Sequence, residues 1–217
     1  MVTDLIAAVK AGDVAAVEAL LMREPELAGA EEDGIPAVRI ALYHRQPEAL
    51  AALLAAGPPL DGLDHAALGR AEELRRALAE DPGLVTRRSA DGFTALHYGC
   101  FFGGAAAAAV LLEAGADPDA EADNPARVRP LHSAAAARDA ESTRLLLEAG
   151  ADPNAQQTGG FTALQAAAQH DDGELAALLL RHGADPALRN DSGDDAHAIA
   201  KAGESSAVLA LLAARAS

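Results

Sequence analysis

The chain has 217 residues and is 50% hydrophobic, but only 3% of its residues are aromatic and tryptophan is absent. Its formal net charge of −16 opposes binding to nucleic acid, where affinity comes mainly from neutralised phosphates, and opposes anionic membrane surfaces for the same reason. Alanine and leucine supply most of the apolar content, which favours closely packed helices and an all-α fold. The single cysteine, Cys100, excludes an intramolecular disulfide, no apolar run is long enough to span a membrane, and the N-terminus lacks the features of a signal peptide. We therefore expect a cytoplasmic protein.

Two helix pairs are predicted at the start of the chain. The first pair spans residues 4–24 and is interrupted at Gly12-Asp13, with small and branched apolar residues along each helix. The second pair follows a turn at Asp33-Gly34 and places helices at Ala37–Arg45 and Glu48–Ala56. Each pair is too small to bury its own apolar face, so each needs a neighbour.

The third unit is irregular. Asp64–Leu68 is too short for a full first helix, whereas Ala71–Glu80 has the apolar spacing of an amphipathic helix. We expect the loop before this unit to be short or missing, which predicts a kink or notch between the second and fourth units.

From about residue 90 the same landmarks recur. Gly-Ala-Asp-Pro begins at Gly115, Gly150 and Gly183, at intervals of 35 and 33 residues, and leucines recur at the same two intervals at positions 96, 131 and 164. Each glycine stands where a helix is expected to end in the left-handed conformation. A last unit is predicted from Asn190 to Ser217, without another Gly-Ala-Asp-Pro.

These landmarks resemble the ankyrin repeat family, whose pattern is roughly G-x-T-P-L-H-x-A-A, then a leucine-rich helix, then G-A-D-x-N. The matching segments are Gly92–His97, Arg129–Ala135 and Thr162–Ala167. The resemblance implies an all-α ankyrin-repeat solenoid of about seven helix-turn-helix repeats with β-turn or hairpin fingers. It also implies a single domain with approximate units 1–30 (N-terminal cap), 31–61, 62–88 (irregular), 89–121, 122–156, 157–188 and 189–217 (C-terminal cap).

The resemblance assigns most motif residues to the scaffold. In the family the motif histidine bonds to the backbone of the adjacent finger, which we expect of His97 and His132, with Gln165 taking that position in the sixth unit. Thr94 and Thr162 are expected to cap helices. Arg129 stands where threonine is expected, so that cap must be replaced or lost. Cys100 is interpreted as a small core residue, because no oriented base accompanies it.

The resemblance places function on finger tips and on the exposed face of the first helices, which together form a concave groove. The residues at these positions are Ile35, Tyr43, His44, Asp91, Phe93, Phe101, Phe102, Asn124, Val128, Ala136, Thr158, Phe161, Gln169, His170, Asp191 and Asp194. Aromatic residues are common energetic anchors of interfaces, although Phe93 and Phe161 could equally pack the bases of their fingers. We expect a monomer that binds an unidentified partner protein through this groove, with no nucleic acid, no membrane, no cofactor, no metal ion and no catalytic residues.

Two other functions remain open. One is a small-ligand or metal-binding protein, or an enzyme, that uses the notch at the third unit, where Tyr43, His44 and His65 would gather. The other is an inhibitory, antitoxin-like module whose acidity mimics an acidic ligand of a basic target. The arginines at positions 87, 88, 127 and 129 form either a local basic spot or scattered pairs with nearby acids.

Overall fold

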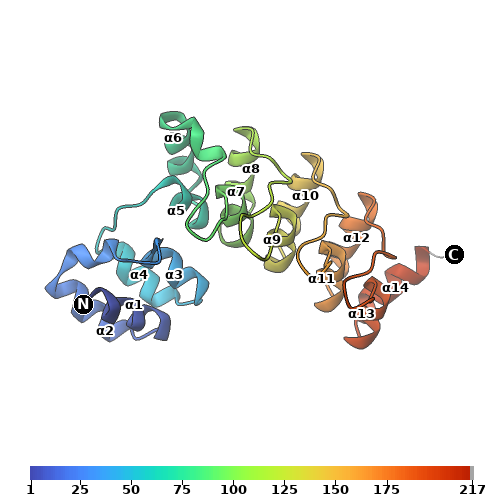
Figure 1. The fold of residues 1–217 in the computed structure, drawn as a ribbon, viewed down its shortest axis with the longest axis horizontal. Helices are drawn as coiled ribbons and strands as arrows, with labels where there is room; N and C mark the ends of the chain where they lie inside the picture. The colour runs from blue at the N-terminus through green and yellow to red at the C-terminus, as the bar shows by residue number, and fades with distance from the viewer. Residues whose placement is uncertain (216–217) are drawn as a thin grey trace.

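The computed structural model describes residues 1–215; Ala216 and Ser217, where the predicted last unit ends, lie outside the described residues. The described chain forms a curved row of helix pairs (Figure 1). The pairs are α1 (Val2–Ala11) with α2 (Val14–Arg23), α3 (Ala37–Tyr43) with α4 (Pro47–Ala55), α5 (Gly62–Ala67) with α6 (Ala71–Glu80), α7 (Ala95–Tyr98) with α8 (Ala105–Glu113), α9 (Pro130–Ala137) with α10 (Ala140–Glu148), α11 (Ala163–Gln169) with α12 (Gly173–Arg181), and α13 (Ala196–Ala202) with α14 (Ser206–Arg215).

Shorter elements connect the pairs. The 3₁₀-helices η1 (Pro25–Gly29) and η2 (Pro82–Val85) follow α2 and α6, and the π-helix η3 (Gly99–Gly103) continues α7. Strands β1 (Glu31–Glu32) and β2 (Ile35–Pro36) pair antiparallel, with Glu32 opposite Ile35. This hairpin is the finger that precedes α3.

Helix ends follow the polar residues that the sequence supplies. Asp13, Asp139 and Asp172 accept backbone N–H groups in the first turns of α2, α10 and α12. Thr162 and Gln165 form the reciprocal capping box of α11, as expected for Thr162. The glycines of the three Gly-Ala-Asp-Pro segments have φ of 87°, 96° and 93°, which confirms the predicted left-handed helix ends.

Two predicted helix ends are corrected. α3 ends at Tyr43 instead of Arg45, because Arg45 itself adopts a left-handed φ of 53°. α5 begins at Gly62 instead of Asp64, because the Asp61 carboxylate accepts the Asp64 N–H at 2.8 Å and caps the helix two residues before the predicted start.

The helices form two layers. First helices pack on the first helices of neighbouring pairs, as α9 does on α11, and second helices pack on second helices, as α10 does on α12. Figure 1 shows α9, α11 and α13 along the lower, concave side and α8, α10 and α12 along the upper side. The concave side is therefore built from first helices and from the fingers that precede them.

The row is broken between the second and third pairs. The buried apolar residues of the described chain form two clusters, one from Leu5 to Leu53 and the other from Leu63 to Leu212. The segment 57–61 joins them without a strand, and Figure 1 shows it rising from α4 toward α5. The third unit therefore lacks a finger, as expected from the sequence. The two apolar cores meet at this notch.

Candidate functional site

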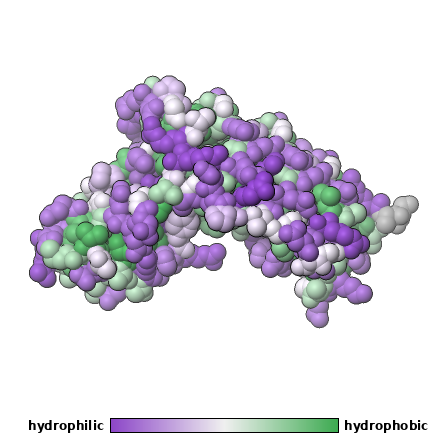
Figure 2. Space-filling model, in the orientation of Figure 1, coloured by the Kyte–Doolittle hydropathy of each residue, from purple (hydrophilic) through white to green (hydrophobic). Residues whose placement is uncertain are grey.

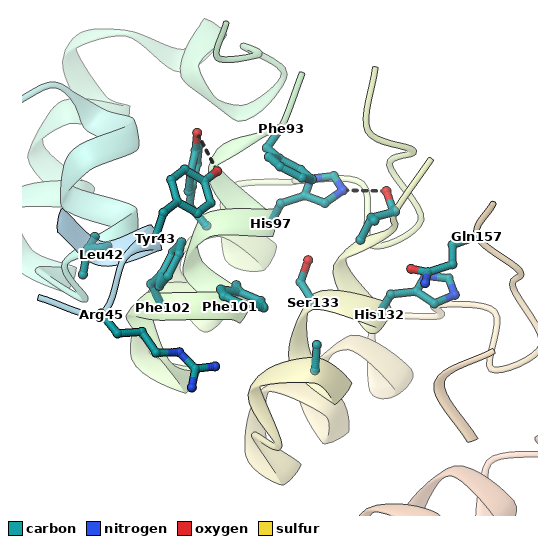
Figure 3. A pocket seen from close by; sticks show the side chains of 13 residues that line it. Leu42, Tyr43, Arg45, Phe93, His97, Phe101, Phe102, His132, Ser133 and Gln157 are labelled. Carbon is teal, nitrogen blue, oxygen red and sulfur yellow. Dashed lines mark hydrogen bonds between the residues drawn. The ribbon is translucent and has the colours of Figure 1, made fainter. Parts of the chain in front are cut away.

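An aromatic pocket of about 290 Å³ opens on the concave side near this notch (Figure 3). It is lined by Leu42, Tyr43, Arg45, Phe93, His97, Tyr98, Phe101, Phe102, Val128, His132, Ser133, Ala136 and Gln157. The lining comes from α3 on one side of the notch and from α7, η3 and α9 on the other. A change in the angle between the two cores would therefore change the pocket.

The aromatic wall is a set of edge-to-face contacts. The ring centroids of Tyr43 and Phe102 lie 5.3 Å apart, and those of Phe101 and Phe102 lie 4.6 Å apart. Phe93 packs against the His97 ring at 5.4 Å. Such pairs hold rings in defined orientations, yet Tyr43 and Phe101 remain 40% and 38% exposed.

The π-helix η3 places these phenylalanines. Arg45 is the residue before the N-cap of the second helix in the second unit, and it has positive φ. The equivalent residue in the fourth unit is Gly103, but there the positive φ, 75°, is found at the next residue, Gly104. An added Cβ on Gly103 would lie 2.0 Å from the carbonyl oxygen of Ala66 in α5. The backbone of η3 thus approaches α5 too closely for any side chain at Gly103, and the π-turn accommodates the shifted helix end.

The pocket is open where α9 carries the small side chain of Ala136. Tyr43, Phe101 and Ala136 occupy the same position in their units, the seventh residue after the N-caps at positions 36, 94 and 129. An aromatic ring at this position in α9 would enter the pocket, where Ala136 leaves it empty. The exposed Gln169 follows at the same position in α11.

Buried side chains brace successive fingers beneath the pocket. His97 Nε2 lies 2.9 Å from the Val128 carbonyl oxygen, and its Nδ1 accepts the Thr94 N–H at 3.2 Å. Nδ1 therefore carries no proton, and Nε2–H donates to the carbonyl. Burial lowers the pKa of His97 to about 4 and lowers the pKa of His132, so both rings are neutral at pH 7.

The same brace repeats in register. His132 Nε2 lies 3.1 Å from the Ala155 carbonyl oxygen, and the Gln165 side-chain amide donates to the Leu188 carbonyl at 2.9 Å. His132 Nδ1 accepts the N–H of Arg129, so half of the capping box survives where the threonine is absent. The expected histidine contacts with adjacent fingers are thus confirmed.

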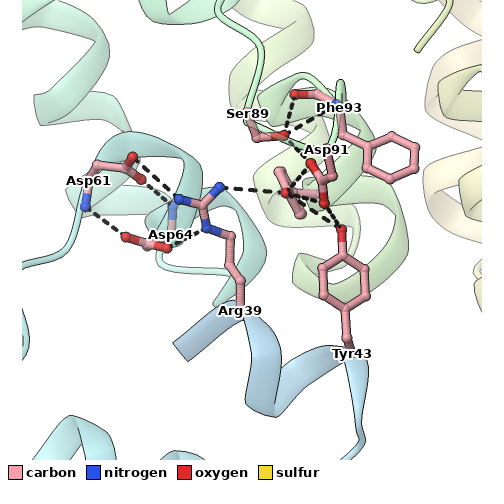
Figure 4. A network of polar contacts seen from close by, with 8 residues as sticks. Arg39, Tyr43, Asp61, Asp64, Ser89, Asp91 and Phe93 are labelled. Carbon is pink, nitrogen blue, oxygen red and sulfur yellow. Dashed lines mark hydrogen bonds and ion pairs between the residues drawn. The ribbon is translucent and has the colours of Figure 1, made fainter. Parts of the chain in front are cut away.

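A polar network crosses the notch (Figure 4). The Arg39 side chain, 4% exposed, forms an ion pair with the buried Asp64 carboxylate at 2.8 Å and a longer one with Asp61 at 3.7 Å. Arg39 also donates to the Tyr98 hydroxyl at 3.5 Å, and Tyr98 donates to Asp91 at 2.8 Å. Residues of α3 are thereby joined to the third and fourth units.

The network perturbs its titratable groups. Burial raises the pKa of Asp64 to about 6, even though Arg39 opposes the shift. Burial and the hydrogen bond to Asp91 raise the pKa of Tyr43, and burial raises the pKa of Tyr98. Both phenols therefore stay protonated and act as hydrogen-bond donors at neutral pH.

The family follows from these repeating braces together with two sequence matches. Models of ankyrin repeats match residues 131–217, as three copies, and residues 91–123, as a single repeat. The chain belongs to the ankyrin repeat family. The expected all-α ankyrin solenoid is confirmed, and ankyrin repeats are generally protein-interaction modules and typically non-catalytic. No curated protein matches the chain.

The second and third ankyrin repeats carry charged residues at the position of the brace. The third residue after the N-cap is His97, His132 or Gln165 in the regular repeats, but Arg39 and Asp64 in the second and third. Because the third repeat lacks a finger, no finger carbonyls face this position, and Arg39 reaches a carboxylate instead. The ion pair thus replaces the brace at the notch.

The structure distributes the predicted groove residues of the ankyrin repeats over several places. The pocket is lined by Tyr43, Phe93, Phe101, Phe102, Val128 and Ala136. A neighbouring hollow contains Ile35, His44 and Asp91 together with Tyr43. Phe161, Gln169, His170 and Asp191 are exposed farther along the row.

The remaining predicted groove residues hold fingers together. The Asn124 side chain donates to the Asp91 carbonyl at 2.9 Å, and the Thr158 hydroxyl donates to the Pro125 carbonyl at 2.6 Å. The Asp194 carbonyl accepts the Gln165 amide at 3.1 Å. These contacts link each finger to the next.

Several site residues were missed by sequence reasoning. They are Arg39, Leu42, Arg45, Tyr98, Ser133 and Gln157. Aligning residues 36–44 with residues 94–102 would have placed Arg39 at the brace position opposite His97. The inward orientation of Tyr98 had no such signal, because the helix continues into a π-helix directly after it.

The alternative site at the notch is not assembled as expected. Tyr43 and His44 line the hollow beside the aromatic pocket, whereas His65 lines a separate hollow with Asp61 and Arg76. Within residues 1–215, no three histidine, cysteine or carboxylate side chains are grouped to hold a metal ion. Every helix in that range is too short or too polar to cross a membrane.

Three of the four arginines pair with acidic side chains. Arg87 pairs with Asp81, Arg127 with Glu121 at 2.8 Å, and Arg129 with Asp119 at 3.5 Å. The guanidinium of Arg88 donates to the Gly92 carbonyl at 3.1 Å. Arg127, Arg129 and Arg88 nevertheless lie near one carboxylate, since all three lower the pKa of Glu121.

Proposed function

We propose that this ankyrin repeat chain binds a partner protein through its concave face, without catalysis, and that the aromatic pocket takes an apolar side chain of that partner. The observation that carries the proposal is the row of equivalent positions at Tyr43, Phe101 and Ala136. Two carry exposed rings, and the third leaves a gap beside them. Deep, partly desolvated pockets lined by aromatic rings typically carry most of the binding energy of an interface.

The size of the pocket supports a side chain over a free metabolite. Its volume of about 290 Å³ lies just below the range of about 300–1,000 Å³ for small-molecule sites. Two of its titratable neighbours are already engaged, because His97 uses both ring nitrogens in the scaffold and the Tyr98 hydroxyl bonds to Asp91. The surface therefore offers shape and apolar contact more than proton transfer.

The proposal is tested by filling the pocket. We expect Ala136→Phe to remove a partner captured from cells of the source organism, because the new ring occupies the site of the partner's side chain. Ala137→Phe is the matched control, since Ala137 is the next residue of α9, is exposed and does not line the pocket. Circular dichroism shows whether both variants fold.

Two outcomes decide the matter. A partner retained by wild type and Ala137→Phe but lost from folded Ala136→Phe supports the proposal. If folded Ala136→Phe captures the same partners as wild type, the pocket is not the binding site. We also propose a monomer in the cytoplasm, in keeping with the single cysteine, and light scattering of the purified chain measures its oligomeric state.

A further inference from the structure

Tyr43 separates two hollows of different chemistry. Tyr43 lines both the aromatic pocket and a hollow of about 330 Å³ that contains the acidic residues Glu32, Asp33 and Asp91. Tyr43 is 40% exposed, so a partner can reach it. A partner segment that fills one hollow passes directly beside the other.

The second hollow carries unbalanced negative charge. Lys10 pairs with Glu32, whereas Asp33 and Asp91 form no ion pair with any residue in the range 1–215. Figure 4 shows the Asp91 carboxylate surrounded by the hydroxyls of Ser89, Tyr43 and Tyr98. Hydroxyl donors stabilise a carboxylate but do not cancel its charge.

Arg39 is a buried cation close to this hollow, but its charge is already paired. Arg39 lies behind Tyr98 and pairs with both Asp64 and Asp61, so this group contributes two carboxylates and one guanidinium. The polar network therefore adds to the negative potential behind Tyr43 instead of relieving it. The formal net charge of −16 acts in the same direction over the whole chain, and Figure 2 shows hydrophilic residues over most of the visible face.

We propose that the partner presents a lysine or arginine next to the apolar side chain that fills the aromatic pocket, and that this cation enters the acidic hollow beside Asp33 and Asp91. This inference rests on the proposed function and adds the chemistry of the partner to it. The exposed ring of Tyr43 contributes a π-face to the same cation. The recognised element is a basic–apolar pair of side chains on an exposed segment.

Arg45 favours one orientation of the bound partner segment over the reverse. Figure 3 shows its guanidinium at the end of the pocket away from the Tyr43 hydroxyl. A segment bound in the reverse direction would place its cation near Arg45, where like charges repel. The partner's basic side chain therefore lies near the Tyr43 hydroxyl, and its apolar side chain lies between that hydroxyl and Arg45.

A phage-displayed random peptide library tests the inference on the full chain. Peptides are selected on wild type, and those that also bind Ala136→Phe are discarded, which leaves ligands of the pocket. We expect the remaining sequences to be enriched in a lysine or arginine within a few residues of a large apolar side chain. Enrichment of apolar residues without a basic one, or beside an acidic one, overturns the inference while the proposed function stands.

A charge variant tests the position of the cation. Asp33 has a φ of 52°, a conformation that asparagine tolerates well, so Asp33→Asn removes the charge with little strain. The control is Glu113→Gln, which removes the charge of an exposed residue at the end of α8, in the outer layer away from the groove. We expect Asp33→Asn to weaken a selected peptide by about threefold at low salt, with the difference from wild type vanishing in about 0.5 M salt.

The outcomes distinguish a failure of the acidic hollow from a failure of the aromatic pocket. Equal affinities of Asp33→Asn and Glu113→Gln at low salt contradict the acidic hollow as the receiving site. If every selected peptide binds Ala136→Phe as well as wild type, the aromatic pocket itself is not the binding site and the proposed function fails first.

Discussion

Replacing Arg39 by methionine would leave the Asp64 carboxylate buried without its cation. The two side chains are 4% and 2% exposed and lie 2.8 Å apart, so solvent screens neither of them well. Removing one partner of such a buried pair typically costs about 3–5 kcal/mol of stability. Asp64 keeps a hydrogen bond from the Asp61 N–H at 3.0 Å, which places the expected loss near the lower end, at about 3 kcal/mol at pH 8.

The loss should depend on pH in a defined direction. The pKa of Asp64 is already raised from 3.8 to about 6 by burial, and removing the guanidinium raises this pKa further. Below that raised value the folded variant binds a proton that the unfolded chain releases, so its stability falls as pH rises through this window. The penalty of Arg39→Met is therefore largest at pH 8 and shrinks toward pH 5.

Urea unfolding followed by circular dichroism at pH 5 and pH 8 measures both effects. The double variant Arg39→Met/Asp64→Asn is the internal control, because it removes the buried charge and keeps a side-chain oxygen to cap α5. It should be more stable than Arg39→Met at pH 8. A penalty below about 0.5 kcal/mol, the range of ordinary surface substitutions, or one equal at both pH values, would refute the reasoning.

The remaining predictions concern the braces and the notch. His97→Gln should cost less than about 1 kcal/mol in urea unfolding, because Gln165 makes the same contacts in its own repeat. His97→Ala should cost about 1–3 kcal/mol, because it leaves the buried Thr94 N–H without its acceptor; equal losses would contradict the brace. Because the pKa of His97 is about 4 in the folded chain and 6.5 in its ordinary state, wild type should lose stability as pH falls from 6.5 to 4, by at most about 3 kcal/mol. His97→Gln should flatten that slope, and an unchanged slope would assign it to other groups. Gly103→Ala should destabilise by more than about 2 kcal/mol, because its Cβ meets the Ala66 carbonyl at 2.0 Å, and a stable variant would show that α5 and η3 separate easily.

The helix pairs could be predicted from the sequence because each is encoded locally. Capping residues such as Asp172 and Thr162, and the glycines of Gly-Ala-Asp-Pro, act within a few residues of their own positions. The short third repeat was also visible, since too few residues precede Ala71 for a finger and a full first helix. Local signals therefore suffice for the elements and for the place where the row is interrupted.

The composition of the pocket could not be predicted in the same way. The π-helix arises from the close approach of Gly103 to Ala66, which lies far from it in sequence. The predicted groove positions were equivalent along the stack, yet Phe102 packs against Tyr43 across the notch and Phe101 packs against Phe102, while Phe161 is exposed farther along. Which aromatic residues converge depends on how the two cores are set against each other, and that geometry is not local.

The most direct test of the central claim, that a partner protein occupies the aromatic pocket, is photo-crosslinking from within it. p-Benzoylphenylalanine at Phe101 places a reactive ring in the pocket wall, and the same residue at Ala106, exposed on α8 in the outer layer, is the control. The account predicts that irradiation in cells of the source organism yields a discrete adduct with a protein from position 101 and none from position 106. Adducts from position 106 alone, or identical adducts from both positions, would contradict it.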